Sequence, residues 1–290
     1  MNFPDVETAR TICIWLMDLS LALLAGSGIL YVKAKHLRLR KLAIAGLMLL
    51  AVMIPVYLLA TAALFTDQPL PNAIGQIPLV LTHSQTGRLV WPLIAGWLLM
   101  IMAVSGRISR IAAVVAALSG FVLAAWARAA SGHAGDSGLY TAAVMIHTLH
   151  IVAACSWSGL LVAYLTLGNK AALANHGEVI RYLSEMALLC LLTVMFTGLA
   201  DVLRIVEASG KTSFLTSVYA ADLGVKLLLA AGAAGLGGLN RFLVMPGVGA
   251  SSKLQNRFML IALLEAVLLG LVMLLGVQLG STPPPANSLL

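Results

Sequence analysis

Three histidines near the middle of the chain are the residues whose type and spacing point most directly to chemistry. His147 and His150 lie three residues apart, which brings both side chains to one face of a helix. His133 follows Gly132 in a short polar loop just before them and can fold over the pair. Imidazole is a common metal ligand, and an ionisable side chain inside an apolar span usually marks a site. The pattern therefore predicts a metal site or the ligand set of a cofactor.

Each of these residues also has a simpler interpretation. His83 is a further candidate ligand, because the long outer segment 66–87 can fold over the site, but it can equally be an exposed loop histidine. His147 and His150 can instead form hydrogen bonds between helices, as buried polar side chains do in membrane bundles. Cys13 is a soft side chain near the outer end of the first span, and a small buried apolar residue is the more ordinary role for it.

The composition places these residues inside a membrane protein. Hydrophobic residues make up 60% of the sequence and charged residues 10%, and the mean hydropathy is +0.98. A span needs about 20 apolar residues, so the fold class is an all-α integral membrane protein with about eight transmembrane helices. We expect a single polytopic domain over residues 1–290, with spans at about 11–32, 42–65, 88–106, 108–127, 139–167, 180–206, 219–243 and 257–280.

The distribution of basic residues predicts the topology. Of the 18 Lys and Arg residues, twelve lie near one set of alternate loops, including the cluster at 33–41, five lie on the opposite side, and Lys226 lies within a predicted span. The positive-inside rule assigns the first group to the cytoplasm, so both termini are expected in the periplasm of a bacterial inner membrane. Acidic residues precede the first span and the basic cluster follows it, so we interpret 11–32 as a retained helix and not as a signal peptide.

Several charged residues fall within the predicted spans. Asp222 and Lys226 are four residues apart, and Asp201 and Arg204 are three apart, so each pair can form along one helix. Two further acidic residues in spans, Asp18 and Glu265, have no partner on their own helix. They must find a partner across the bundle, stay protonated or serve an ion path.

No motif of a soluble enzyme is present: there is no P-loop, GxSxG, HExxH or glycine-rich dinucleotide turn. We therefore expect a protein that is not an enzyme. The net charge of +7 is attributed to topology signals and not to nucleic-acid binding, and the three cysteines show no paired spacing.

The ordered set of motifs resembles the CopD-type copper resistance membrane proteins. The matching pieces are GHA at 132–134, HTLH at 147–150, WSGL at 157–160, Lys226, Asn240-Arg241, Pro246, Glu265 and the terminal STPPP. The resemblance implies an eight-helix inner-membrane protein that handles copper on its periplasmic side and carries it inward, with a periplasmic copper chaperone as a candidate partner. The chain departs from the family at Trp157-Ser158-Gly159 and at 218–222.

Two alternatives to copper transport remain at this point. A haem-binding electron carrier would also place histidines in membrane helices. Two histidines three residues apart cannot bind opposite faces of one haem, so a second helix would have to supply an axial ligand. A helix bundle with a purely structural role is the other alternative, and the histidines inside the span count against it.

Overall fold

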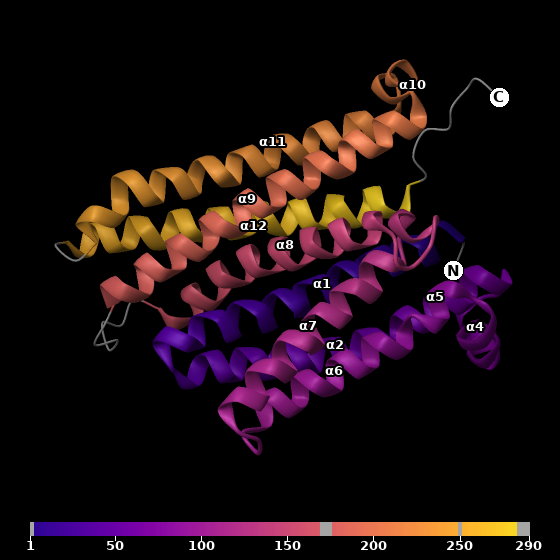
Figure 1. Cartoon of the computed structure of the whole chain (residues 1–290), viewed down its shortest axis with the longest axis horizontal. Coiled ribbons are helices and arrows are strands. Elements are labelled where there is room, and N and C mark those ends of the chain that lie inside the picture. Colours follow the sequence, from indigo (N-terminus) through magenta and orange to yellow (C-terminus); the bar gives the residue numbers. More distant parts are fainter. Residues whose placement is uncertain (1–2, 169–175, 249–250, 283–290) are drawn as a thin grey trace. The chain divides into compact units, whose positions relative to one another are not determined.

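The computed structural model describes residues 3–168, 176–248 and 251–282, and no strand is found in these ranges. Eight helical segments are long and apolar enough to cross a membrane, which confirms the predicted all-α membrane fold. The main helices (Figure 1) are α1 (Phe3–Ala34), α2 (Leu37–Thr66), α6 (Val90–Ser105), α7 (Arg110–Ala130), α8 (Ala142–Leu167), α9 (His176–Ser209), α11 (Val218–Leu239) and α12 (Ser252–Ser281). The seventh span continues beyond α11 through a π-helical turn, Asn240–Val244, and a short 3₁₀ turn, Met245–Gly247.

The helices extend further toward the first link than we predicted. The link between α1 and α2 is reduced to Lys35 and His36, with Lys35 at a φ of 43°. Arg38, assigned above to a loop, therefore lies in the first turn of α2, and Lys41 in the second. Arginine and lysine are good helix formers, and their long side chains can reach water from a helix end. Lys170, another residue used for the topology, lies outside the described residues, as do residues 283–285 of the terminal motif.

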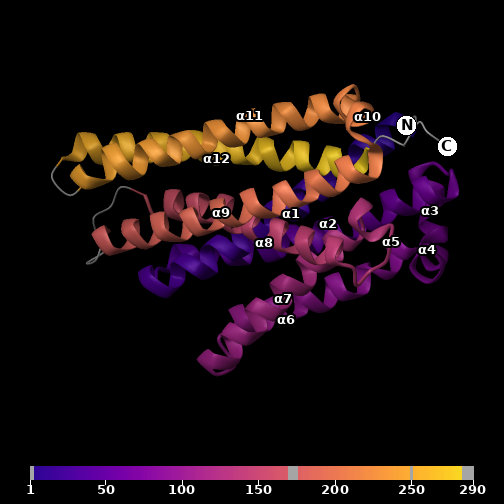
Figure 2. The same ribbon diagram turned by 45° about the horizontal axis from the view of Figure 1, so that its top comes forward.

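The outer segment 66–87 is folded into short helices, as its prolines suggest. These are α3 (Leu70–Ala73), a 3₁₀ turn at Ile74–Gln76, α4 (Ile77–His83) and α5 (Gln85–Arg88), and Figure 2 shows α3, α4 and α5 close together. Proline is the second residue of both α3 and α4, within the first turn, where its missing N–H leaves no helical hydrogen bond unmade. The segment therefore consists of several short elements and not of one continuous helix.

One compact unit comprises residues 1–21 and 44–152. Within it, α6 and α7 run side by side in both views (Figures 1 and 2). A Cβ atom on Gly96 would lie 2.6 Å from the carbonyl oxygen of Gly120, so only glycine permits this close helix contact. The four histidines of the predicted site all belong to this unit.

A second compact unit comprises residues 22–43 and 153–290, so α1, α2 and α8 contribute to both units. In it, α11 and α12 lie side by side in both views (Figures 1 and 2). One of its apolar clusters surrounds Trp157 and Leu161 of α8 with Ala233 of α11 and Ala262 of α12. The expectation that residues 1–290 form a single domain stays a prediction.

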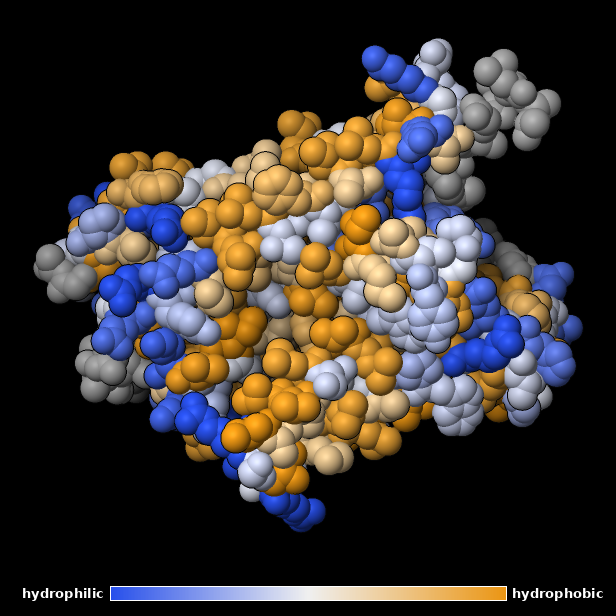
Figure 3. Space-filling view, in the orientation of Figure 1, coloured by the Kyte–Doolittle hydropathy of each residue, from blue (hydrophilic) through white to orange (hydrophobic). Residues whose placement is uncertain are grey.

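The surface of the helices is apolar along most of their length. Large hydrophobic side chains are exposed on many helices, for example Leu118 of α7 and Leu228 of α11. In the space-filling view (Figure 3), hydrophobic residues cover the middle of the helices and hydrophilic residues gather near their ends. This distribution is the one that a lipid bilayer requires, and it identifies the chain as a multi-pass membrane protein.

Candidate functional site

The structure brings His147 and His150 together on α8. Their ring centroids are 6.0 Å apart and the ring planes differ by only 8°, as expected for residues three apart on a helix. Both side chains are half-buried. With metal–nitrogen bonds of about 2.1 Å, two imidazoles on one ion have their centroids roughly 5–6 Å apart. The pair therefore has a spacing that suits joint binding of one metal ion.

His133 lies in the turn after α7, at the start of a 3₁₀ turn formed by His133–Gly135. Its Nδ1 is 3.2 Å from Oδ2 of Asp136, and its Nε2 is buried without a hydrogen-bond partner. The glycine that the turn requires is Gly135, because a Cβ there would overlap the carbonyl of Ala130. Gly132, which directly precedes His133, has an ordinary extended backbone with φ −105° and ψ −172°. The turn thus leaves one nitrogen of His133 available for a ligand.

His83 is exposed at the end of α4. Its Nδ1 lies 2.7 Å from Oγ1 of Thr82 and 3.3 Å from the carbonyl oxygen of Leu79, so this nitrogen is used locally. Within residues 3–168, 176–248 and 251–282, no group of three or more His, Cys, Asp and Glu side chains stands close enough to hold a metal ion. The structure therefore brings together two of the four predicted histidines, and the larger ligand set stays a prediction.

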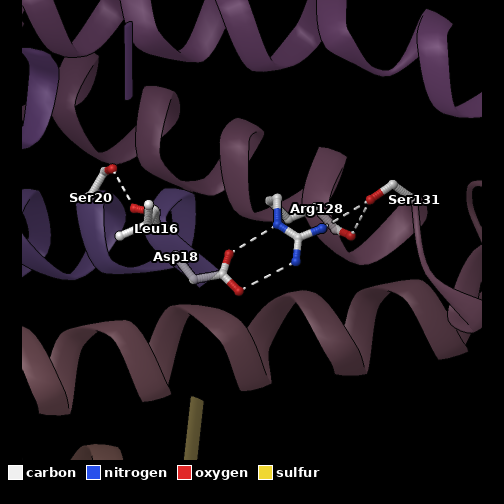
Figure 4. Close-up of polar contacts among 5 residues, drawn as sticks. All are labelled: Leu16, Asp18, Ser20, Arg128 and Ser131. Carbon is white, nitrogen blue, oxygen red and sulfur yellow. Dashed lines mark hydrogen bonds and ion pairs between the residues drawn. The ribbon is translucent and has the colours of Figure 1, made fainter. Parts of the chain in front are cut away.

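Asp18 has a partner across the bundle that the sequence did not reveal. Its carboxylate accepts two hydrogen bonds from Arg128 near the end of α7, from Nε at 3.0 Å and from Nη2 at 3.3 Å (Figure 4). Arg128 also donates through Nη1 to the hydroxyl of Ser131 at 3.1 Å. Both charged side chains are 10% exposed. Bidentate geometry is the strongest form of a carboxylate–arginine contact, and this one ties α1 to α7.

Glu265 of α12 is also satisfied by a distant residue. Its Oε1 accepts a hydrogen bond of 2.9 Å from the indole N–H of Trp157, and both residues are 3% exposed. Gly237 leaves room for the carboxyl group, because a Cβ there would lie 3.0 Å from Oε1. Trp157 is therefore a hydrogen-bond donor to a buried acidic group, in addition to its role in the apolar cluster.

The two predicted ion pairs along single helices have different outcomes. Asp201 and Arg204 form the expected contact on α9, with Nη2 and Oδ1 3.7 Å apart. In the described part of the chain, Asp222 forms no ion pair with Lys226, so that prediction was wrong. Instead, Nζ of Lys226 lies beside Gly276 of α12. The lysine side chain is thus directed toward a neighbouring helix and not toward Asp222.

Comparison with known proteins gives one match. No curated protein and no solved structure matches the chain. Residues 177–279 match the family model described as Copper resistance protein D, CopD. This segment includes Lys226, Asn240 and Glu265, three of the residues on which the resemblance was based, whereas the four histidines lie outside it. Through residues 177–279, the chain is thus similar to the CopD-type copper resistance family.

Proposed function

We propose that the chain is a copper-binding protein of the bacterial inner membrane, which moves copper from the periplasm toward the cytoplasm through a histidine-lined site open to the periplasm. The observation that carries the proposal is the pair of imidazoles at 6.0 Å on a membrane-spanning helix of a CopD-type protein. Imidazole suits copper, and a histidine inside a span is costly without a role.

The surrounding residues support this assignment of roles. His147 and His150 would be the primary ligands, since they share one helix face. His133 would be the third, because its buried Nε2 lacks a partner, and His83 would act nearer the surface. Both termini would be periplasmic, and a periplasmic copper chaperone is a candidate donor. The chain would act as a carrier and not as an enzyme.

The test replaces His147 and His150 by alanine, singly, with His36→Ala as the matched control on the predicted cytoplasmic side. His36 accepts a hydrogen bond from the backbone of Arg38 and lies in the link between α1 and α2. Copper bound to purified protein and copper accumulated by cells should both fall by at least about tenfold in the two site variants, because one missing ligand costs several kcal/mol of binding. His36→Ala should match the wild-type protein.

A second readout separates copper from haem. An absorption spectrum of the purified protein should show no haem Soret band. Copper binding should weaken on acidification, because an imidazole must be neutral to bind a metal. Undiminished copper in folded His147→Ala and His150→Ala proteins, or a stoichiometric Soret band, would contradict the proposal.

A further inference from the structure

Two sulfur atoms meet between α1 and α2, outside the histidine site. Cys13 Sγ lies 3.9 Å from Met53 Sδ, and the thiol donates a hydrogen bond of 3.2 Å to the carbonyl oxygen of Met53. Cys13 is only 2% exposed, and Met53 is half-buried. The residues are 40 positions apart in the sequence and belong to the same compact unit. The fold has therefore brought a thiol and a thioether into direct contact inside the membrane span.

The spacing of the two sulfur atoms suits a soft metal ion. With metal–sulfur bonds of about 2.3 Å, two sulfur atoms at this separation subtend an angle of roughly 120° at an ion between them. Such an angle corresponds to three-coordinate geometry. Thiolate and thioether ligands select Cu(I) over harder ions. The separation of the two sulfur atoms is thus compatible with one Cu(I) ion that bridges them.

A small cavity adjoins the next turn of both helices. Met17 lies four residues after Cys13, and Tyr57 lies four residues after Met53, so each is on the same helix face as the sulfur residue before it. Both line a cavity of about 10 Å³. The hydroxyl of Tyr57, a residue that is 3% exposed, is buried without a hydrogen-bond partner. A buried hydroxyl without a partner is costly, and Met17 beside the same cavity has a flexible side chain that suits irregular space.

We propose that Cys13 and Met53, with Met17 as the third ligand, form a sulfur site for Cu(I) that is separate from the histidine pair. The identity of the metal as copper rests on the proposed function. Binding replaces the thiol proton: the neutral Cys13 thiol and Cu⁺ give a copper thiolate and one H⁺, with no change of oxidation state. The two methionine sulfurs donate lone pairs without losing protons. The histidine pair would then receive copper from outside, and the sulfur site would hold it within the span as Cu(I).

The test uses the full-length protein in detergent with Ag(I) as the probe, because Ag(I) is a soft monovalent ion that does not change oxidation state under these conditions. Cys13→Ser keeps a hydroxyl donor for the Met53 carbonyl and removes the soft ligand. Met53→Leu conserves volume and removes the thioether. Cys190→Ala is the matched control, since Cys190 packs against the apolar cluster around Trp157.

The wild-type protein should bind one Ag(I) at this site and release about one proton with it, so the affinity should rise tenfold per pH unit. Cys13→Ser should lose both the ion and the proton release, Met53→Leu should bind at least tenfold more weakly, and Cys190→Ala should behave as wild type. X-ray absorption of Cu(I)-loaded wild-type protein should show sulfur neighbours.

Unchanged Ag(I) binding and proton release in Cys13→Ser would overturn the sulfur site, as would an equal loss in Cys190→Ala. Absence of sulfur neighbours in the wild-type spectrum would overturn it without any variant. The same experiments distinguish a failure of the proposed function from a failure of the sulfur site. If His147→Ala and His150→Ala keep their copper while Cys13→Ser loses Ag(I), the histidine site is wrong and the sulfur site stands. The reverse result removes only the sulfur site.

Discussion

At the scale of single residues, buried polar side chains form contacts with residues that are far away in the sequence. Asp18 and Arg128 are each 10% exposed and form a bidentate pair (Figure 4). By contrast, Arg181 and Glu185 on α9 form a single contact of 3.7 Å and are mostly exposed. A buried pair is strongly destabilised when one partner is removed, because the other charge stays buried without compensation. An exposed pair has no such penalty.

The Asp18→Asn substitution should therefore lower the free energy of unfolding by about 3–5 kcal/mol. The Glu185→Gln substitution, its control, should change it by less than about 1 kcal/mol. Thermal unfolding of the detergent-solubilised protein provides the measurement. The double variant Asp18→Asn/Arg128→Gln should lose less than the sum of the two single variants, because it no longer buries an unpaired charge. Strictly additive losses would show that the two side chains do not support each other.

At the scale of helices, close contact depends on glycine at defined crossing points. In the second unit, α1 and α8 meet at Gly26 and Gly159, where a Cβ on Gly26 would overlap the backbone of Gly159. Gly28, two residues further along α1, has open space where its Cβ would be. The helix contact thus requires glycine at position 26, whereas position 28 has room for a side chain. Membrane helices associate largely through such close backbone approach.

We expect Gly26→Ala to destabilise the protein by about 1–3 kcal/mol, because the added methyl group forces the two helices apart. Gly28→Ala should be neutral or stabilising by up to about 1 kcal/mol, since alanine favours the helix and meets nothing. The apparent unfolding temperature should therefore fall in Gly26→Ala and stay unchanged or rise in Gly28→Ala. A similar loss in both variants would show that helix propensity, and not the crossing, determines the effect.

At the scale of the whole molecule, the proposed function depends on the orientation of the eight spans. The asymmetric distribution of basic residues predicts which side of the membrane the histidines face. The charge rule assigns the segments that carry or adjoin the four histidines to the outer side, and it assigns the larger group of basic residues to the cytoplasm. The sulfur atoms of Cys13 and Met53 lie within the first and second spans. The proposed direction of copper movement depends on this orientation.

Reporter fusions test the orientation. A fusion ending at Asp67, after α2, should report the periplasm, and a fusion ending at Arg107, after α6, should report the cytoplasm, because an alkaline-phosphatase reporter is active only outside and a fluorescent reporter only inside. The two fusions should give opposite signals with each reporter. Identical signals, or the reverse assignment, would contradict periplasmic termini and an outward-facing histidine site.

The sequence by itself determined the helical class and the existence of eight spans, because both depend on local composition over about 20 residues. It also determined contacts that lie within one or two turns of a helix. His147 lies beside His150, and Asp201 contacts Arg204, because three residues nearly complete a turn. The break-up of the outer segment 66–87 into short helices was likewise set by its prolines.

Only the tertiary structure decided the partners that lie far apart along the chain. Asp18 meets Arg128 over 110 residues, Trp157 meets Glu265 over 108, and Cys13 meets Met53 over 40. Helix spacing permitted Asp222 to pair with Lys226, yet the Nζ atom of the lysine lies beside Gly276 of α12. A buried charged group is stabilised by the polar partners that best offset its desolvation cost. These partners belong to the helices that pack beside it, so only the tertiary structure determines which they are.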